Sequence, residues 1–340
     1  MHKNKIGVVG ATGRLGTEIV KILACQEVAV VAIASKQKNS WGDSVTYHEY
    51  GLNSKPQDLQ PLFQKLDAVI IAAPVSSSIL QRKAITAGCH VIDVGIQTEV
   101  IEELLQLDDL AKDRQCCLVA MAGLAPGLTG LLGTELLTKT SPSNFVDVCL
   151  IQNSQGTSGE RGTKDMLDLL TSDSKKLKSC LVAKEQSSNI LKIKAFSFDT
   201  PESVLLLHKE RLKFYTVFDR SLLNTLIVNL GRIRQYSLSV YGLLRDKIAA
   251  AKAAKSIPDQ EAIILSAVAK SSDGKVDSWS SYHLASDYGA TAAIACTMTA
   301  ITLSNRCVFG AGHLGSFVNL ETISQHPWMQ KVILASSNKE

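Results

Sequence analysis

The sequence predicts an α/β protein: an N-terminal doubly wound Rossmann domain and a second α+β domain built on a mostly antiparallel sheet. Three observations lead to this fold class. A glycine motif follows an apolar run at the start of the chain, strand and helix patterns alternate up to residue 124, and strand-rich segments with a D-G hairpin signal follow residue 145. The length of 340 residues also fits two domains. We expect residues 1–124, completed by 286–340, to form the dinucleotide-binding domain, and residues 125–285 to form a substrate-binding or dimerisation domain.

The first element is a short strand, turn and helix. Ile6 to Val9 has the composition of a buried parallel strand, Gly10, Gly13 and Gly16 follow at three-residue spacing, and Thr17 to Ala24 is amphipathic. Glycines at such a turn allow a tight bend, close approach of a pyrophosphate to the backbone, and close packing of helix on sheet. The N–H groups at the helix start then attract phosphate. The motif predicts a nucleotide site; the alternative is a plain glycine-rich turn.

The end of the second predicted strand bears on the choice of cofactor. Val28 to Ala34 is followed by Ser35, Lys36, Gln37 and Lys38, without an acidic residue. In NAD-binding domains an acid near this point binds the ribose 2′-hydroxyl, whereas a hydroxyl and lysines suit a 2′-phosphate. We therefore expect NADP(H) in preference to NAD(H), unless Lys36 and Lys38 simply face solvent.

Further strand patterns continue the first domain. They cover residues 67–73, 89–94 and 116–121, with helix patterns over 78–87 and 98–112 between them. Ala73 and Pro74 follow one of these strands, at the edge where open α/β sheets bind ligands, so we expect them to line the cofactor site. The segment from Ala122 to Gly130 has two glycines flanking Pro126, a turn able to bring backbone amides close to a ligand.

The second domain has a different order of elements. We expect strands over residues 146–152, 191–198, 204–207 and 214–218, helices over 164–170, 221–230 and 237–255, and a hairpin of 263–270 with 277–284. The small-residue helix 288–303 is expected to return to the first domain. Its apolar part, 290–303, is too short to cross a bilayer.

Composition narrows the possible functions. The chain is 45% hydrophobic and 20% charged with a net charge of +4, which is ordinary for a globular protein and gives no nucleic-acid footprint. Its eight cysteines lack zinc-ligand spacing, so we expect no metal site and a reducing, cytoplasmic setting. P-loop, HExxH and GxSxG motifs are absent from the sequence.

Five segments together resemble the saccharopine dehydrogenase-like NADP-binding oxidoreductases, which include saccharopine reductases and carboxynorspermidine synthases. They are residues 10–16, 67–74, 87–93, 122–130 and 287–292. The resemblance implies a two-domain, homodimeric enzyme that moves hydride between a nicotinamide and a carbon–nitrogen centre of a small amino-acid-derived substrate. One departure is Ile96-Gln97, where such enzymes commonly have more polar residues; residues 140–260 show no clear match.

The resemblance also assigns cofactor contacts. It implies that the pyrophosphate is bound by Gly10, Thr12, Gly13, Arg14 and Leu15. Ser35 and Lys36 would hold the adenosine ribose end, and Ala73 and Pro74 the nicotinamide ribose. The segment from Gly123 to Gly127 would form the edge of the reaction site.

No motif identifies a proton donor, so several side chains are candidates for catalysis. Arg161 could bind a substrate carboxylate in a bidentate pair, and Lys164 lies on the same glycine- and hydroxyl-rich segment. His283 and Asp287 are close in sequence where the chain returns to the first domain. Each of the four could equally be a structural residue, and structural roles are favoured for His90 and His313.

Two other functions stay open at this point. One is a dihydrodipicolinate-reductase-like or other carbonyl reductase, although no run of adjacent histidines with a nearby lysine is present. The other is a catalytically silent NADP-sensing or scaffold protein, because a fold does not imply an activity.

Overall fold

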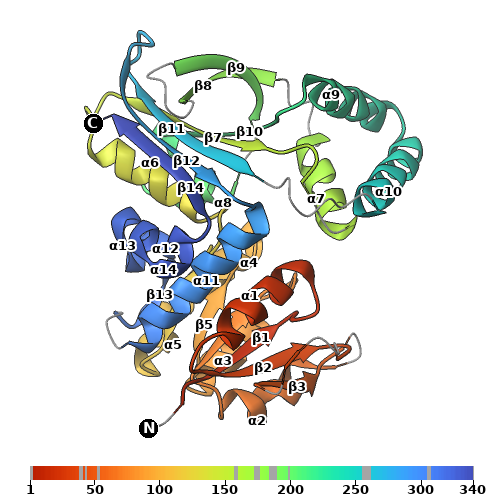
Figure 1. Ribbon diagram of the computed structural model, residues 1–340, viewed down its shortest axis with the longest axis vertical. Helices are drawn as coiled ribbons and strands as arrows, with labels where there is room; N and C mark the ends of the chain where they lie inside the picture. The colour runs from red at the N-terminus through yellow and green to blue at the C-terminus, as the bar shows by residue number, and fades with distance from the viewer. Residues whose placement is uncertain are drawn as a thin grey trace. The chain divides into compact units, whose positions relative to one another are not determined.

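A computed structural model describes residues 3–37, 41–42, 44–51, 54–156, 160–171, 177–183, 190–197, 200–254, 262–304 and 308–339. The chain divides into two compact units. The first comprises Met1–Leu131 and Tyr288–Val332, and the second comprises Leu132–Asp287 and Ile333–Glu340. Each unit is described by itself below, and Figure 1 gives the labels of the elements.

The first unit is built on a seven-stranded sheet in which every pairing is parallel. Its strand order is β13-β6-β5-β4-β1-β2-β3. The strands are β1 (Lys5–Val9), β2 (Ala29–Ala34), β3 (Val45–Glu49), β4 (Ala68–Ile71), β5 (His90–Asp93), β6 (Cys117–Ala120) and β13 (Gly310–His313). The order reverses at β1, between β4 and β2, so this is the switch point at which doubly wound sheets bind their ligand.

Helices cover both faces of this sheet. They are α1 (Arg14–Ala24), α2 (Gln60–Phe63) after a 3-10 turn, α3 (Ile79–Thr86), α4 (Thr98–Leu105), α5 (Asp108–Asp113) and α11 (Asp287–Leu303), followed by α12 (Leu314–Phe317), α13 (Leu320–Gln325) and α14 (Pro327–Gln330). The apolar runs of β1 and β4 are almost completely buried, as expected for central parallel strands. The expected helix 98–112 is divided into α4 and α5.

Helix α11 belongs to the first unit, although it follows the second unit in sequence. Its alanines and threonines are almost all buried, and the Cys296 thiol lies 3.9 Å from the Ile19 carbonyl oxygen of α1. Small side chains permit this close approach. The two units differ from the expected domain boundaries in two places. The first unit continues to Leu131 instead of ending at residue 124, and β14 (Ile333–Lys339) pairs with β12 in the second unit. Only residues up to Val332 return to the first unit.

The second unit contains another seven-stranded sheet, in the order β14-β12-β11-β7-β10-β9-β8. Its strands are β7 (Phe145–Gln152), β8 (Leu177–Ala183), β9 (Ile190–Ser197), β10 (Leu212–Phe218), β11 (Ile263–Lys270), β12 (Val276–Leu284) and β14. All pairings are antiparallel except that of β7 with β10. The predicted fold class, including the hairpin of β11 with β12, is therefore confirmed.

Strand β8, at one edge of this sheet, curls back over the middle of the sheet (Figure 1). The Leu181 N–H of β8 donates to the buried Asp147 carboxylate of β7, and the Ala183 N–H donates to Ser266 Oγ of β11. Lys270 forms an ion pair with the same Asp147. These contacts close the sheet around the apolar cluster of Cys149, Cys180, Val182, Ala195, Tyr215 and Val217.

The second unit also contains α6 (Leu128–Thr138), which begins in the first unit, α7 (Glu160–Thr171), α8 (Pro201–Leu205), a 3-10 turn (Lys209–Arg211), α9 (Ser221–Tyr236) and α10 (Leu238–Ala254). Helices α7, α9 and α10 pack on one another around Leu170, Ile227 and Tyr241. The expected strand 204–207 is wrong, because Pro201 and the capping residue Thr200 start a helix there. None of the helices in the described part of the chain has the length and apolar character needed to cross a membrane.

Candidate cofactor and substrate sites

The three glycines of the first turn have different geometric roles. Gly10 has φ +81°, and a Cβ there would lie 2.9 Å from the Ala73 Cβ of the neighbouring β4 exit. A Cβ on Gly16 would lie 2.2 Å from the Gly10 carbonyl oxygen, so only glycine lets α1 pack this closely. Gly13 is exposed, and a Cβ there would meet only the Gly10 carbonyl oxygen, at 3.2 Å. Gly13 therefore leaves space on the outer side of the turn.

The start of α1 faces this space. Gly13 stands at the N-cap and has no side chain to cap the first N–H groups of the helix. A phosphate is the usual partner of such uncapped N–H groups. Thr12 and Leu15 are half-buried beside the turn, and the Arg14 guanidinium lies 5.0 Å from the centre of the Tyr288 ring of α11. The turn thus fits a pyrophosphate, with Arg14 held at its margin by an aromatic ring that the sequence motif does not include.

The end of β2 offers the residues expected at the adenosine ribose. Ser35 and Lys36 are exposed directly after β2, whereas Lys38 lies outside the described residues. Tyr47 Oη donates a hydrogen bond of 3.1 Å to the Ala34 carbonyl, and its ring centre lies 6.2 Å from that of Trp41. Residues 35–37 include no acid, whereas the exposed Glu49 at the end of β3 is in register with Ala34.

The other expected cofactor residues differ in accessibility. Ala73 is half-buried and Pro74 exposed at the exit of β4, next to Gly10. Gly123 is buried instead. Its carbonyl accepts the Leu128 N–H, and a Cβ there would lie 3.3 Å from the Thr291 methyl group of α11. The turn after β6 is thus packed within the first unit, and only Ala125 of the segment 121–130 is exposed.

Asp93, at the end of β5, is a buried carboxylate that the sequence analysis did not select. Its two oxygens accept hydrogen bonds from Gln81 Nε2 at 2.7 Å and from the Gly95 N–H at 2.6 Å. Burial raises the pKa of Asp93, and these two hydrogen bonds oppose the shift. The Gln81 Oε1 is buried without a partner in the described structure. Asp93 therefore fixes the turn at Gly95, next to the β4 exit.

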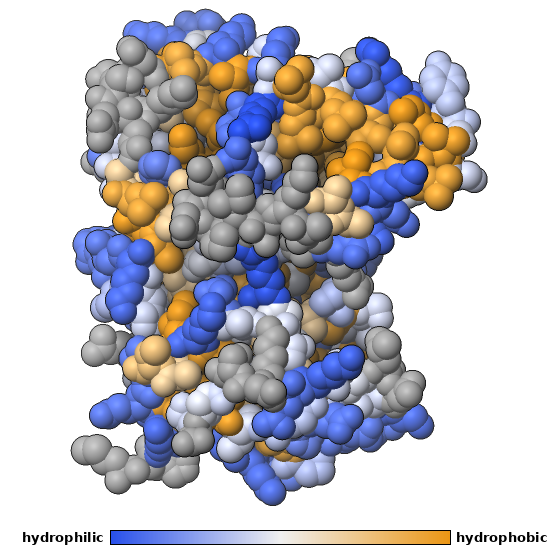
Figure 2. Space-filling model, turned by 45° about the vertical axis from the view of Figure 1, so that its right-hand side comes forward, coloured by the Kyte–Doolittle hydropathy of each residue, from blue (hydrophilic) through white to orange (hydrophobic). Residues whose placement is uncertain are grey.

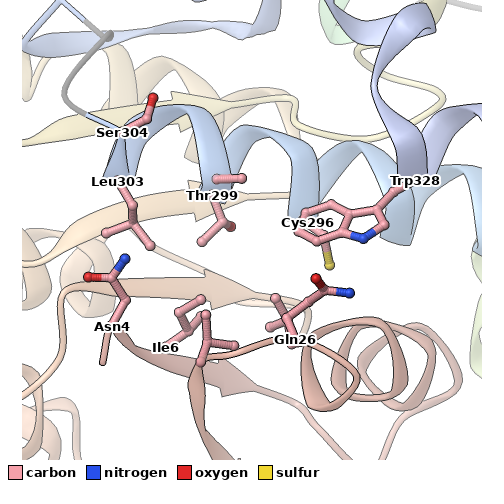
Figure 3. Close-up of a pocket in the computed structure, with 11 residues that line it drawn as sticks. Asn4, Ile6, Gln26, Cys296, Thr299, Leu303, Ser304 and Trp328 are labelled. Atoms are coloured by element: carbon pink, nitrogen blue, oxygen red, sulfur yellow. The ribbon is translucent and has the colours of Figure 1, made fainter. Parts of the chain in front are cut away.

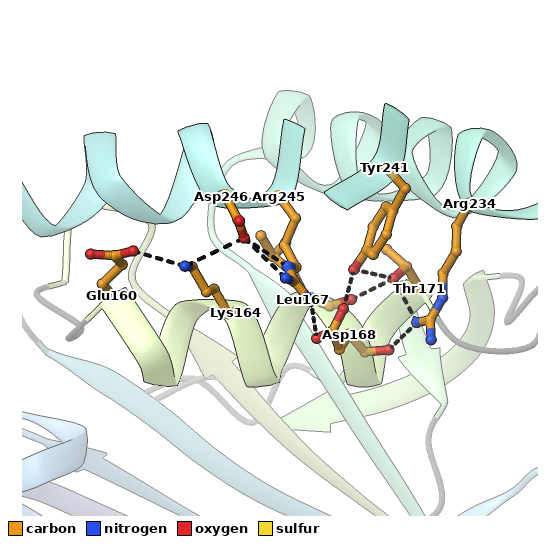
Figure 4. A network of polar contacts seen from close by, with 9 residues as sticks. All are labelled: Glu160, Lys164, Leu167, Asp168, Thr171, Arg234, Tyr241, Arg245 and Asp246. Atoms are coloured by element: carbon orange, nitrogen blue, oxygen red, sulfur yellow. Dashed lines mark hydrogen bonds and ion pairs between the residues drawn. The ribbon is translucent and has the colours of Figure 1, made fainter. Parts of the chain in front are cut away.

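Lys164, proposed from sequence as a catalytic group, lies in a network between helices (Figure 4). Its ammonium is 2.8 Å from Glu160 and 3.4 Å from Asp246 of α10, and these partners raise the pKa of Lys164. The same network holds Asp168, which accepts from Tyr241 and Arg245. Lys164 thus joins α7 to α10. The Arg161 side chain and residues 157–159 lie outside the part of the chain that the structure describes.

His283 and Asp287 lie near the end of the second sheet at which β7 and β10 finish. His283 on β12 is in register with Ile264 of β11, which is in register with Ile151 near the end of β7. Asp287 begins α11. Two residues that the sequence analysis did not select lie near these strand ends as well: Asp219, directly after β10, and Lys252 of α10. Burial lowers the pKa of Lys252, and the carboxylates of Asp219 and Asp287 oppose that shift. Their spacing in sequence carries no signal of this proximity.

His90 and His313 have structural surroundings. His90 Nδ1 accepts the Cys117 N–H at 2.9 Å, and burial lowers the pKa of His90. His313 is the last residue of β13 and the N-cap of α12, and burial lowers its pKa too. No group of three or more metal-ligating side chains was found among the described residues.

A cavity of about 230 Å³ lies in the first unit (Figure 3). Cys296 and Thr299 of α11 and Trp328 of α14 face Ile6 and Gln26 across it. Ile6 lies near the amino end of β1, and Gln26 comes shortly before β2. The cavity is therefore at the amino ends of the strands, opposite the glycine turn. It is not the cofactor site.

Comparison with known proteins supports the first unit as a cofactor-binding domain. Residues 5–102 match the family model of the semialdehyde dehydrogenase NAD binding domain. The N-acetyl-gamma-glutamyl-phosphate reductase of Bacillus subtilis (strain 168) is 37% identical over 97 residues, covering 26% of this chain. That alignment spans only 28% of the relative's length. The expectation of a nicotinamide-dinucleotide-binding Rossmann domain is confirmed, and the match is to NAD(P)-binding oxidoreductases in general rather than to the saccharopine dehydrogenase-like group.

Solved structures are similar to this chain at low sequence identity. An engineered D-amino acid dehydrogenase gives a TM-score of 0.49 at 11% identity, covering 96% of this chain and 97% of that one. The WlbA (WbpB) dehydrogenase of Thermus thermophilus, in complex with NAD and UDP-GlcNAcA, gives 0.45 at 12% identity, covering 96% and 92%. Values this low say nothing about the substrate.

Proposed function

We propose that this protein is an NADP(H)-dependent oxidoreductase that transfers hydride to or from a carbon–nitrogen centre of an amino-acid-derived substrate. The observation that carries the cofactor part is the glycine turn, in which Gly13 leaves the uncapped start of α1 open. The substrate part rests on the resemblance to saccharopine dehydrogenase-like enzymes. It is compatible with a relative whose name is that of an amino-acid-derivative reductase.

In this proposal the bound nicotinamide supplies or accepts the hydride, and the chain's own residues bind and orient the reactants. The α1 N–H groups hold the pyrophosphate, Ser35 and Lys36 hold the 2′-phosphate, and Ala73 and Pro74 border the nicotinamide ribose. His283 and Asp287 are the sequence-predicted catalytic candidates that share a sheet edge in the second unit. Lys164 is a weaker candidate because its ammonium already has two carboxylate partners.

A second candidate function is the reduction of a carbonyl or acyl phosphate, which the family model and the Bacillus subtilis relative favour. Covalent catalysis of such a reduction needs an accessible, activated thiol. Of the cysteines that the structure describes, only Cys25 is exposed, and it is the C-cap of α1, at the other end of the helix from the glycine turn. Burial raises the pKa of the Cys89, Cys116 and Cys296 thiols. The described residues therefore favour direct hydride transfer over a thioester route.

The test combines cofactor binding with turnover. NADPH fluorescence titration should show binding by the wild type and a loss of at least about tenfold in affinity for Gly13→Leu, because the side chain fills the phosphate position. Gly242→Leu, at an open position on α10, is the matched control. Turnover is then measured with 2-oxo acids plus amino acids, and separately with aldehydes and acyl phosphates.

Each result separates the candidates. Oxidation of NADPH only with a 2-oxo acid and an amine together supports reduction of a carbon–nitrogen centre, and turnover of aldehydes or acyl phosphates alone replaces it by the second function. Binding without any turnover favours a silent NADP sensor or scaffold, whereas unchanged affinity in Gly13→Leu contradicts the assigned site.

We also propose that the protein is a cytoplasmic homodimer. On the outer side of helix α9, Leu222, Leu226 and Tyr236 are exposed apolar side chains. Leu222 is 84% exposed and Tyr236 is 90% exposed, and on α10 Leu238 and Leu243 are 70% and 67% exposed. Figure 2 shows apolar side chains gathered on one face of the protein. An apolar patch can pair with the same patch of a second copy across a twofold axis, so a second copy of this chain is the occupant that we propose.

A further inference from the structure

Lys252 lies at the carboxyl end of the only parallel strand pair described in the second unit. It is half-buried near the end of α10, and its Nζ is 5.4 Å from the centre of the Phe218 ring. Phe218 is the last residue of β10 and is in parallel register with Gln152, the last residue of β7. Both strands of this pair therefore end beside Lys252.

The Asp219 carboxylate is held at the same strand ends. Its Oδ1 accepts the Ser154 N–H at 2.8 Å, and its backbone N–H donates to the Gln152 carbonyl at 3.0 Å. These bonds fix the residue while the side chain stays exposed. Its Oδ2 has no hydrogen-bond partner among the residues that the structure describes.

Lys252 is electrostatically coupled to Asp219 but forms no ion pair with it within 4.0 Å in the described structure. Lys164, Arg245 and Lys270 of this unit, by contrast, each contact a carboxylate directly, as not every basic residue of the unit does. Burial lowers the pKa of Lys252, while the carboxylates of Asp219 and Asp287 oppose that shift. Lys252 and Asp219 thus carry opposite charges beside the same strand ends without contacting each other.

We infer that Lys252 and Asp219 bind the head group of an α-amino acid, with Lys252 Nζ contacting the carboxylate and Asp219 Oδ2 the ammonium. This inference rests on the proposed function and names the residues that would select its substrate. A simple carboxylate would meet the negative charges of Asp219 and Asp287, and a simple amine would meet Lys252. A zwitterion satisfies Lys252 and Asp219 together.

The experiment compares ligands that differ only in the carboxylate. Calorimetric titration of the NADPH-saturated protein uses L-lysine, L-glutamate and cadaverine, the diamine that corresponds to lysine without its carboxylate. We expect at least one of the two amino acids to bind, and the wild type to bind L-lysine about tenfold more tightly than cadaverine. In Lys252→Met this preference should disappear while NADPH affinity is unchanged. Lys247→Met, an exposed lysine on the same helix, should behave as the wild type.

Asp219→Asn is the second variant. It changes an exposed side chain, and circular dichroism checks the fold of all variants. It should weaken binding of L-lysine and cadaverine alike. Equal binding of L-lysine and cadaverine by the wild type, no binding of either amino acid, or unchanged affinities in both variants would overturn the inference. Failure of the proposed function would appear differently, as amino-acid binding without NADPH oxidation.

Discussion

Gly10, Gly13 and Gly16 are required by three different contacts within one turn. Gly10 needs a positive φ and close approach to Ala73, and Gly16 needs the space between α1 and the Gly10 carbonyl. Gly13 has an ordinary backbone conformation with φ −64° and is exposed, so the fold tolerates a side chain there. Only Gly13 is therefore suited to separate cofactor binding from folding by mutation.

Lys36 is the residue expected to select NADP(H). Lys36→Glu places an acid where NAD-binding domains bind the ribose 2′-hydroxyl, so NADPH affinity should fall by about tenfold or more and NADH affinity should rise. Fluorescence titration with both cofactors measures the change. Lys65→Glu, an exposed lysine before β4 at the opposite sheet edge, is the control. Equal wild-type affinity for NADPH and NADH would refute the assignment.

The buried Asp93 carboxyl predicts a pH-dependent stability difference. Because burial raises its pKa in the folded state, the unfolded chain loses this proton at a lower pH, and wild-type stability falls as pH rises between the unfolded and folded pKa values. Asp93→Asn lacks this loss, and its amide nitrogen could donate to the unpartnered Gln81 Oε1. We expect the variant to gain stability relative to wild type as the pH rises above about 4, the usual pKa of an unfolded aspartate, with a difference of about 1 kcal/mol near neutral pH.

Thermal unfolding across this pH range gives the comparison for Asp93. Asp113→Asn, which alters an exposed carboxyl on α5, is the matched control and should track the wild type at every pH. A constant difference between Asp93→Asn and wild type would show that the buried carboxyl is not the cause.

At the scale of single elements, α8 shows how a local cap can outweigh β propensity. Residues 204–207 are β-branched or aliphatic, which favours a strand, yet the chain is helical from Pro201 to Leu205. The Thr200 hydroxyl accepts the Ser203 N–H at 3.1 Å, and Ser203 Oγ accepts the Thr200 N–H in return. Pro201 follows at the first helical position, where its fixed φ is favourable.

The cap at Thr200 is expected to contribute measurably to stability. Thr200→Ala removes the hydroxyl acceptor and should lower the free energy of unfolding by about 1 kcal/mol. Denaturant unfolding measures this loss. Thr200→Ser keeps the hydroxyl and should recover most of it, so equal losses in the two variants would assign the effect to packing of the methyl group instead.

At the scale of the whole molecule, the exposed apolar side chains of α9 and α10 are the main feature that one chain leaves unexplained. Exposed patches of this kind mark interaction surfaces in soluble proteins. The inner faces of the same helices are already used, because Ile227, Leu230 and Tyr241 pack in the core. The outer face is therefore available to a second copy.

The homodimer proposal predicts a change of mass in solution. Light scattering coupled to size-exclusion chromatography should give twice the chain mass for the wild type and the monomer mass for the double variant Leu222→Lys, Leu243→Lys. Leu207→Lys changes an equally prominent apolar residue, 74% exposed, away from α9 and α10 and should leave the dimer intact. A monomeric wild type, or a dimeric double variant, would exclude this interface.

The amino-acid sequence by itself determined the features that depend on local periodicity and backbone freedom. The spacing of Gly10, Gly13 and Gly16, the apolar strand runs and the D-G turn are signals carried by neighbouring residues, and they were enough for the Rossmann unit and the β11–β12 hairpin. Tertiary structure alone decided which distant residues meet. The pairing of β7 with β10 and the packing of α10 bring Lys252 to Phe218 and Asp219, because strand order and register, which periodicity does not encode, set those distances.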